Sequence, residues 1–221
     1  MLELTALQIK GRKMKVYVIN GPKAIGKTDF SVNLAEFLQQ NNKVLLLQAK
    51  RAITSNIEDY FQKDGMVTYD LADYFTGLAP LEIVLVHESQ NLDFIISPLL
   101  EDKYDITAED INNLLNSVNY DYVIIDGVDK NIVANKTSID IIGENDLNLV
   151  NDSDAFFINK TSEDFDIREY KDTIDSKSSS YLGSVKAGEY FKNVIENLVT
   201  DRAVEIPKLG FFEKLKASFR K

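Results

Sequence analysis

The sequence contains no cysteine and a single histidine, His87. Without cysteine there can be neither a disulfide framework nor a thiolate metal site, and one histidine cannot form a multi-histidine site. A reducing compartment is compatible with this composition. A nucleophilic serine or threonine would have only His87 as a partner, and His87 lies in an apolar run where packing is favoured over catalysis.

Long apolar runs and basic residues are also scarce. No stretch approaches the roughly 20 apolar residues that span a bilayer, and residues 1–13 alternate polar and apolar side chains where a signal peptide would have an apolar core. We therefore expect neither an integral membrane protein nor one secreted by that route. The 25 Lys and Arg are outnumbered by 35 Asp and Glu, giving a net charge of -10. Because binding nucleic acid needs a broad basic surface, we expect nucleic acid not to be a main partner.

What is present suits one globular α/β domain with a sizeable core. The 221 residues are 44% hydrophobic and 27% charged, and no internal repeat is visible. We expect a single domain over residues 1–206 and a separate tail over residues 207–221.

The order of apolar patterns predicts alternating strands and helices. Residues 15–20 form a β-branched run typical of a buried parallel strand, residues 28–40 have a helical apolar face, and residues 43–47 form the next strand. This order is a βαβ unit. Further strands are predicted at 92–96, 122–125 and 155–158, and helices at 107–118 and 186–199. In the last helix we expect the inward side chains to be Tyr190, Val194, Ile195 and Leu198. The polar stretch 160–180 is predicted to be loop or frayed helix.

Residues 21–28 match the phosphate-loop pattern G-x-x-x-x-G-K-[ST] at every fixed position. Its glycines let the backbone wrap around phosphates, Lys27 reaches the terminal phosphates, and Thr28 binds Mg²⁺. An accidental match is the alternative, but the pattern lies between a strand and a helix, as the chemistry requires, and the helix adds its positive end. The residues expected to bind the nucleotide are Gly21, Lys23, Ala24, Ile25, Gly26, Lys27, Thr28 and Asp29.

Asp126 ends the strand at 122–125, and beside a phosphate loop it is the natural Walker B acid. We expect Thr28 and Asp126 to hold Mg²⁺, ATP and Mg²⁺ to be the cofactors, and Lys27 and Asp126 to be the catalytic residues. The predicted fold is therefore α/β: a P-loop NTPase-like, mostly parallel sheet flanked by helices on both faces, with a C-terminal amphipathic helix.

The loop, the strand at 43–47, the segment 67–75 and Asp126 occur in an order and spacing that resemble the MinD branch of the MinD/ParA family of deviant Walker P-loop ATPases. The resemblance covers most of residues 14–160 and reappears near the C-terminus. It implies that ATP drives face-to-face homodimerisation, that the dimer binds a membrane or DNA, and that hydrolysis releases it.

Several positions depart from that family's pattern. Pro22 stands where the family has a signature lysine that crosses the dimer interface, and Lys23 is an imperfect substitute. Lys50 occupies the expected place of the catalytic acid. A charged lysine cannot accept a proton from water and would instead attract phosphate oxygens, which favours holding ATP over cleaving it.

Other acidic residues stay open as replacements. Asp129 follows an altered motif after the Walker B acid, and with a different alignment of the loop Glu58 or Asp59 would do the usual work. The chain is also short for the family between residues 159 and 184, which leaves Asn159 or Lys160 as the candidate for contact with the base.

Residues 207–221 predict an amphipathic helix with an aromatic face and basic neighbours. This pattern suits peripheral attachment to an anionic membrane, at the inner face of the cell membrane of a cytoplasmic protein. The resemblance supports this, because MinD proteins end in a similar segment. The alternative is a helix that packs on the domain or on a partner protein. The residues expected to contact lipid are Phe211, Phe212, Leu215, Phe219, Lys214 and Lys216.

Three hypotheses follow. The leading one is an ATP-binding protein whose nucleotide state controls dimerisation and membrane attachment in the spatial positioning or assembly of a cellular machine, with slow or absent ATPase activity and an unidentified protein partner. The second is a degenerate, non-catalytic scaffold that binds a protein. The third, ranked last because of the net charge, is a ParA-like DNA partitioning protein.

Overall fold

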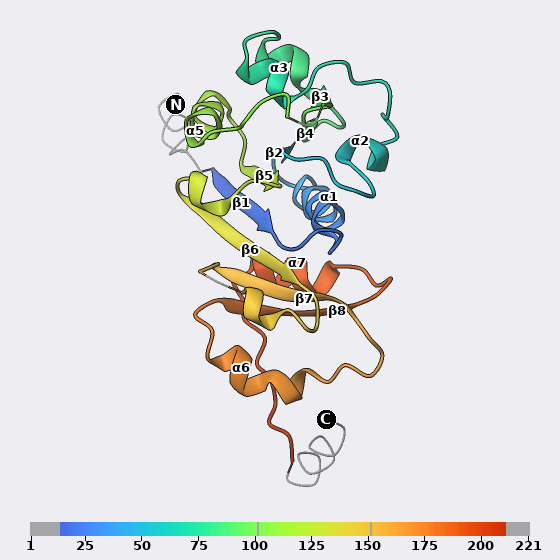
Figure 1. The fold of residues 1–221 in the computed structure, drawn as a ribbon, viewed down its shortest axis with the longest axis vertical. Helices are drawn as coiled ribbons and strands as arrows, with labels where there is room; N and C mark the ends of the chain where they lie inside the picture. The colour runs from blue at the N-terminus through green and yellow to red at the C-terminus, as the bar shows by residue number, and fades with distance from the viewer. Residues whose placement is uncertain (1–13, 101, 151, 211–221) are drawn as a thin grey trace, which may run out of the picture.

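The computed structural model describes residues 14–100, 102–150 and 152–210, and in it eight strands form one sheet in the order β3-β4-β2-β5-β1-β6-β7-β8 (Figure 1). Neighbouring strands are parallel except for the antiparallel pair β3 and β4. The strands are β1 (Lys15–Asn20), β2 (Val44–Gln48), β3 (Val86–His87), β4 (Leu92–Ile95), β5 (Tyr122–Asp126), β6 (Lys136–Ile142), β7 (Ala155–Thr161) and β8 (Ser180–Lys186).

Helices cover both faces of this sheet. The α-helices are α1 (Lys27–Leu38), α2 (Ile57–Tyr60), α3 (Leu71–Phe75), α4 (Leu81–Val84), α5 (Ala108–Ser117), α6 (Lys171–Asp175) and α7 (Lys192–Val199). Apolar side chains of α1, α2 and α7 pack on one face, and those of α3, α4 and α5 pack on the other. A third apolar cluster lies beneath α6, at the opposite end of the molecule from α3 (Figure 1). The predicted α/β fold, a mostly parallel sheet flanked by helices on both faces, is confirmed. None of the helices in the described ranges has the length and apolar character that crossing a bilayer requires.

The central strands are apolar on both sides because they lie between two helical layers. β2 is buried at every residue, and alternate side chains of β1 enter opposite clusters: Tyr17 and Ile19 on one face, Val16 and Val18 on the other. Such continuous apolar runs are typical of parallel strands. α5 begins at a capping box in which the Thr107 hydroxyl accepts a hydrogen bond from the Asp110 amide.

Most of the elements predicted from the sequence are confirmed to within a few residues: β1, α1, β2, β4, α5, β5 and β7. The prediction of a helix over residues 186–199 was wrong in its first half, because Lys186 ends β8 and the helix begins at Lys192. Tyr190 precedes that helix and is 88% exposed, so it does not face inward, whereas Val194, Ile195 and Leu198 do.

The stretch 160–180 contains more structure than expected. It holds α6 and a 3-10 turn, Ile167–Tyr170, and it leads into β8. β8 escaped prediction because Ser180, Gly183 and Ser184 are poor strand formers. Its pairing with β7 and the packing of Tyr181 on Phe156, with ring centroids 5.3 Å apart, hold it in the sheet.

His87 is not packed as predicted. It lies on the short edge strand β3, its side chain is 75% exposed, and its Nδ1 lies 2.5 Å from Asp93 Oδ1. Its apolar neighbours Val84 and Val86 pack into the core, whereas His87 itself lies at the surface of an edge strand with a single neighbouring strand. The expected C-terminal amphipathic helix lies outside the described residues from residue 211 onward, including all six side chains expected to contact lipid.

Candidate functional site

The phosphate loop joins β1 to α1 at the carboxyl edge of the sheet, and its glycines are required by close contacts and by positive φ angles. A Cβ at Gly21, which has φ 147°, would lie 2.2 Å from the Ile141 carbonyl oxygen. A Cβ at Gly26, which has φ 96°, would lie 2.8 Å from Asn159 Nδ2. Both positions therefore admit only glycine without rearrangement.

Lys27 is folded back over the loop. Its Nζ donates hydrogen bonds to the carbonyl oxygens of Gly21, at 3.0 Å, and Pro22, at 2.7 Å. Burial lowers the pKa of this ammonium group, and the Asp126 carboxylate partly counteracts that effect. The Lys27 ammonium group is thus held against the carbonyl oxygens at the start of the loop.

Thr28 and Asp126 meet at the base of the site. The Thr28 hydroxyl donates a 2.6 Å hydrogen bond to Asp126 Oδ2, and Asp126 is 2% exposed. Burial raises the pKa of Asp126 to about 6, while the Thr28 hydrogen bond and the Lys27 charge act in the opposite direction. The neighbouring groups do not offset the cost of burying the Asp126 charge. Such a carboxylate is suited to a divalent cation, which would stabilise its ionised form.

The donors fit magnesium held mainly by its nucleotide. The described part of the chain has no group of three or more His, Cys, Asp or Glu arranged around a metal position. Mg²⁺ typically takes one or two protein oxygens together with phosphates and water. The Thr28 hydroxyl and the Asp126 carboxylate are such a pair, and when bound the ion would neutralise phosphate charge there.

Gln48 is a member of the site that sequence reasoning missed. It ends β2 in register with Asp126 and is fully buried. Its Nε2 donates a long hydrogen bond, 3.4 Å, to the Thr28 hydroxyl, and its Oε1 accepts one from the Ile57 amide at 3.3 Å. Gln48 therefore links the cation-binding hydroxyl to the start of α2. A glutamine closing an otherwise apolar strand was the signal available in the sequence.

Asn159 and Lys160, considered for the base, contact the phosphate loop. Asn159 Nδ2 donates to the Ile25 carbonyl at 2.7 Å, and Lys160 Nζ donates to the Ala24 carbonyl at 2.6 Å. Asn159 is 4% exposed. Two successive carbonyls of the phosphate loop are thus held by side chains from β7.

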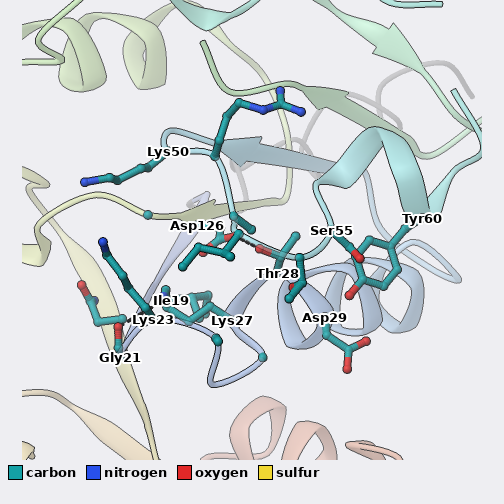
Figure 2. Close-up of a pocket in the computed structure, with 18 of the residues that line it drawn as sticks. Ile19, Gly21, Lys23, Lys27, Thr28, Asp29, Lys50, Ser55, Tyr60 and Asp126 are labelled. Atoms are coloured by element: carbon teal, nitrogen blue, oxygen red, sulfur yellow. Dashed lines mark hydrogen bonds between the residues drawn. The ribbon is translucent and has the colours of Figure 1, made fainter. Parts of the chain in front are cut away.

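These residues open onto a cavity of about 350 Å³, shown in Figure 2. Tyr60, at the end of α2, forms part of its wall, and burial together with Asp29 and Asp126 raises the tyrosine's pKa to about 12, so its hydroxyl is a neutral hydrogen-bond donor at physiological pH. The charged side chains that line the cavity are two carboxylates, Asp29 and Asp126, and four cations, Lys23, Lys27, Lys50 and Arg51. This excess of positive charge suits a polyphosphate.

The candidate replacement acids do not line this cavity. Glu58 is 3% exposed and forms a salt bridge with Arg51, whose Nη2 lies 2.8 Å from Glu58 Oε1. The Asp59 carboxylate accepts a hydrogen bond from the Asn56 amide at the start of α2, and that of Asp129 accepts one from the Asn131 amide. Lys50, in contrast, lines the cavity where the catalytic acid was expected.

A scan against models of known protein families finds no match, and neither does a search of curated proteins. Solved structures do match. A plasmid partition protein from Borrelia burgdorferi is 19% identical with a TM-score of 0.64, over 86% of this chain and 99% of that one. A chain of the MinC:MinD cell division protein complex from Aquifex aeolicus is 17% identical with a TM-score of 0.63, over 89% and 100%.

The chain has the MinD and ParA-like P-loop ATPase fold. The septum site-determining protein MinD complexed with Mg-ADP from Pyrococcus horikoshii is a further match, with 18% identity and a TM-score of 0.60 over 83% of this chain and 86% of that one. The sequence resemblance to MinD/ParA proteins is thus confirmed for the fold. Because the identities are low, the roles of individual residues rest on the geometry of this site.

Proposed function

We propose that this protein binds Mg-ATP in the cavity formed by residues 21–28 and Asp126, and that the nucleotide state controls its self-association and its attachment to an anionic membrane. The observation that supports this most directly is the 2.6 Å contact between Thr28 and Asp126 beneath a glycine loop that encloses the Lys27 ammonium. The role we infer is spatial positioning or assembly of a cellular machine, as a peripheral protein of the inner membrane face.

We propose further that ATP hydrolysis is slow or absent. Among the described residues lining the cavity, the carboxylates are Asp29 and Asp126. Asp126 is engaged by Thr28 and reserved for the cation, and Asp29 lies on the α1 side, where its Oδ1 accepts a 3.3 Å hydrogen bond from Asn33. The Lys50 ammonium group is a hydrogen-bond donor with no acceptor, so it cannot take a proton from an attacking water.

Self-association is proposed at the face that carries the cavity. A second hollow, about 680 Å³, shares part of its wall with the first, including Lys50, Ile53 and Gly127. Ile53 is 72% exposed, and Leu99 and Leu100 are 44% and 68% exposed on the same hollow. Apolar side chains exposed beside a ligand site favour burial against a second copy or another protein.

Membrane attachment is proposed for the tail. The folded domain is anchored up to Ile206, which is 6% exposed in the third apolar cluster, and Pro207 follows it at the surface. The basic and aromatic residues 211–221 come directly after this point. A few apolar side chains bind lipid weakly, so two tails in one dimer would raise avidity by about 10²–10⁴ and make attachment depend on the nucleotide.

The test combines calorimetric Mg-ATP binding, phosphate release and co-sedimentation with anionic liposomes. We expect binding without substantial turnover, ATP-dependent pelleting, and loss of binding in Lys27→Ala. Deletion of residues 209–221 should abolish pelleting but leave nucleotide binding intact. Equal pelleting after the deletion would refute the membrane role, and no Mg-ATP binding at millimolar concentration would favour the non-catalytic scaffold. Binding to DNA in place of liposomes would favour the partitioning alternative.

A further inference from the structure

We propose that Lys23 and Lys50 act as a pair that holds the terminal phosphate from within one subunit, so that a single copy of the chain distinguishes ATP from ADP. This inference rests on the proposed nucleotide site and adds a specificity-determining role for two residues. Its basis is the placement, in the wall of the phosphate cavity, of two cations that form no salt bridge with any described residue.

Lys50 is fixed at the cavity by its backbone. The Ala49 amide donates a 2.8 Å hydrogen bond to the Asp126 carbonyl, which continues the pairing of β2 with β5 by one residue. Lys50 then passes over Gly127, where an added Cβ would lie 3.0 Å from Lys50 Cβ and 3.1 Å from its amide nitrogen. The glycine thus allows the lysine to approach the strand end that carries the Walker B acid.

Lys23 reaches the same cavity from the phosphate loop. Figure 2 shows the Lys23 and Lys50 side chains extending to the same side of the cavity, opposite Asp29 and Tyr60. The residue before Lys23 is Pro22, whose ring offers no hydrogen-bond donor. Lys23 is exposed, and unlike Lys27 it donates no hydrogen bond to the carbonyls of the described phosphate loop.

The other two cations of the cavity already have partners. Lys27 donates to two loop carbonyls, and Arg51 forms its salt bridge with Glu58. Over the described residues, neither Lys23 nor Lys50 has a carboxylate within salt-bridge distance. Both side chains are exposed, so substituting them should leave the folded core unchanged.

Two ammonium groups at one cavity repel each other, and an anion between them offsets that repulsion. Mg-ATP carries about one more negative charge than Mg-ADP, and the added charge is on the terminal phosphate. A charge-assisted hydrogen bond to that group is strong enough to change affinity by about tenfold per lysine. We expect the pair to favour ATP by about 10- to 100-fold, without any residue from a second copy.

The experiment measures dissociation constants for Mg-ATP and Mg-ADP by calorimetry on the full chain and on Lys23→Gln, Lys50→Gln and the double variant. Light scattering at the same concentrations establishes whether the protein is monomeric. Lys192→Gln is the matched control, because this lysine is 75% exposed and lies on α7 away from the cavity. Lys50→Arg retains the charge and should retain most of the preference for ATP.

The expected result is a rise of about tenfold in the ATP dissociation constant for each single variant, with ADP changed less than about twofold. Equal weakening of both nucleotides, or no weakening of either, would overturn the pairing while leaving the nucleotide site intact. A preference for ATP that appears only when the protein is dimeric would overturn the single-subunit assignment. If the wild-type chain binds neither nucleotide, both this proposal and the proposed function are wrong.

Discussion

The ionised Asp126 carboxylate should destabilise the ligand-free protein, and Asp126→Asn should therefore stabilise it at neutral pH. Burial raises the pKa of this group from the ordinary 3.8 to about 6. That difference corresponds to about 3 kcal/mol of folding free energy. Asparagine has nearly the same shape and can still accept the Thr28 hydrogen bond, but it carries no charge.

The sign of the pH dependence follows from proton binding. Between about pH 4 and pH 6 the folded state holds this proton while the unfolded chain has released it, so the contribution of Asp126 to stability falls as the pH rises. The loss of stability is complete once the pH is well above the pKa of Asp126 in the folded protein. Between about pH 5 and pH 8 the advantage of the asparagine variant over wild type in unfolding free energy should grow by about 1–2 kcal/mol.

The assay is urea denaturation of both proteins across this pH range, with chelator present to remove divalent cations. Asp201→Asn is the control, because the Asp201 side chain is 82% exposed. A difference between Asp126→Asn and wild type that stays constant with pH would refute the reasoning. With Mg-ATP added the order should reverse, because the ligand would stabilise wild type and not the variant.

Three further changes have predicted outcomes. Gly127→Ala should lower the unfolding free energy by about 1–2 kcal/mol in urea denaturation, because φ at this position is +91° and the new Cβ would press on Lys50. Asn159→Ala should weaken Mg-ATP binding about tenfold in calorimetry, because the phosphate loop would lose a 2.7 Å hydrogen bond that holds its shape. Thr107→Ala should cost about 1 kcal/mol in thermal denaturation by removing the cap of α5.

The phosphate loop could be predicted because its chemistry is contiguous in the chain. Eight successive residues specify the turn, the cation and the hydroxyl, and the strand and helix on either side are strongly apolar. The same holds for Asp126, which follows an unbroken buried strand. Such local patterns can be read from the sequence because glycine positions and the spacing of apolar residues are enough to specify the backbone conformation.

Residues brought to the site by tertiary structure could not be predicted in the same way. Gln48 contacts Thr28 because β2 lies beside β5, and Tyr60 lines the cavity because α2 packs near α1. Asn159 reaches the phosphate loop from the end of β7, 134 residues beyond the carbonyl it binds. β6, whose first half is polar, was missed because its burial comes from strands β1 and β7 on either side.

The two ends of the sheet restrict how copies of this protein can associate. At one end, β3 has two residues and pairs antiparallel, with the polar His87 at its surface. At the other end, the Val204 amide donates a 2.8 Å hydrogen bond to the Tyr181 carbonyl of β8, so the chain covers part of its own last strand. Short or covered edge strands are poor templates for joining sheets between molecules. The folded state therefore disfavours sheets that continue across subunits and the fibrous aggregates that grow from them. Copies of the chain would associate instead through side-chain surfaces, which a ligand can alter.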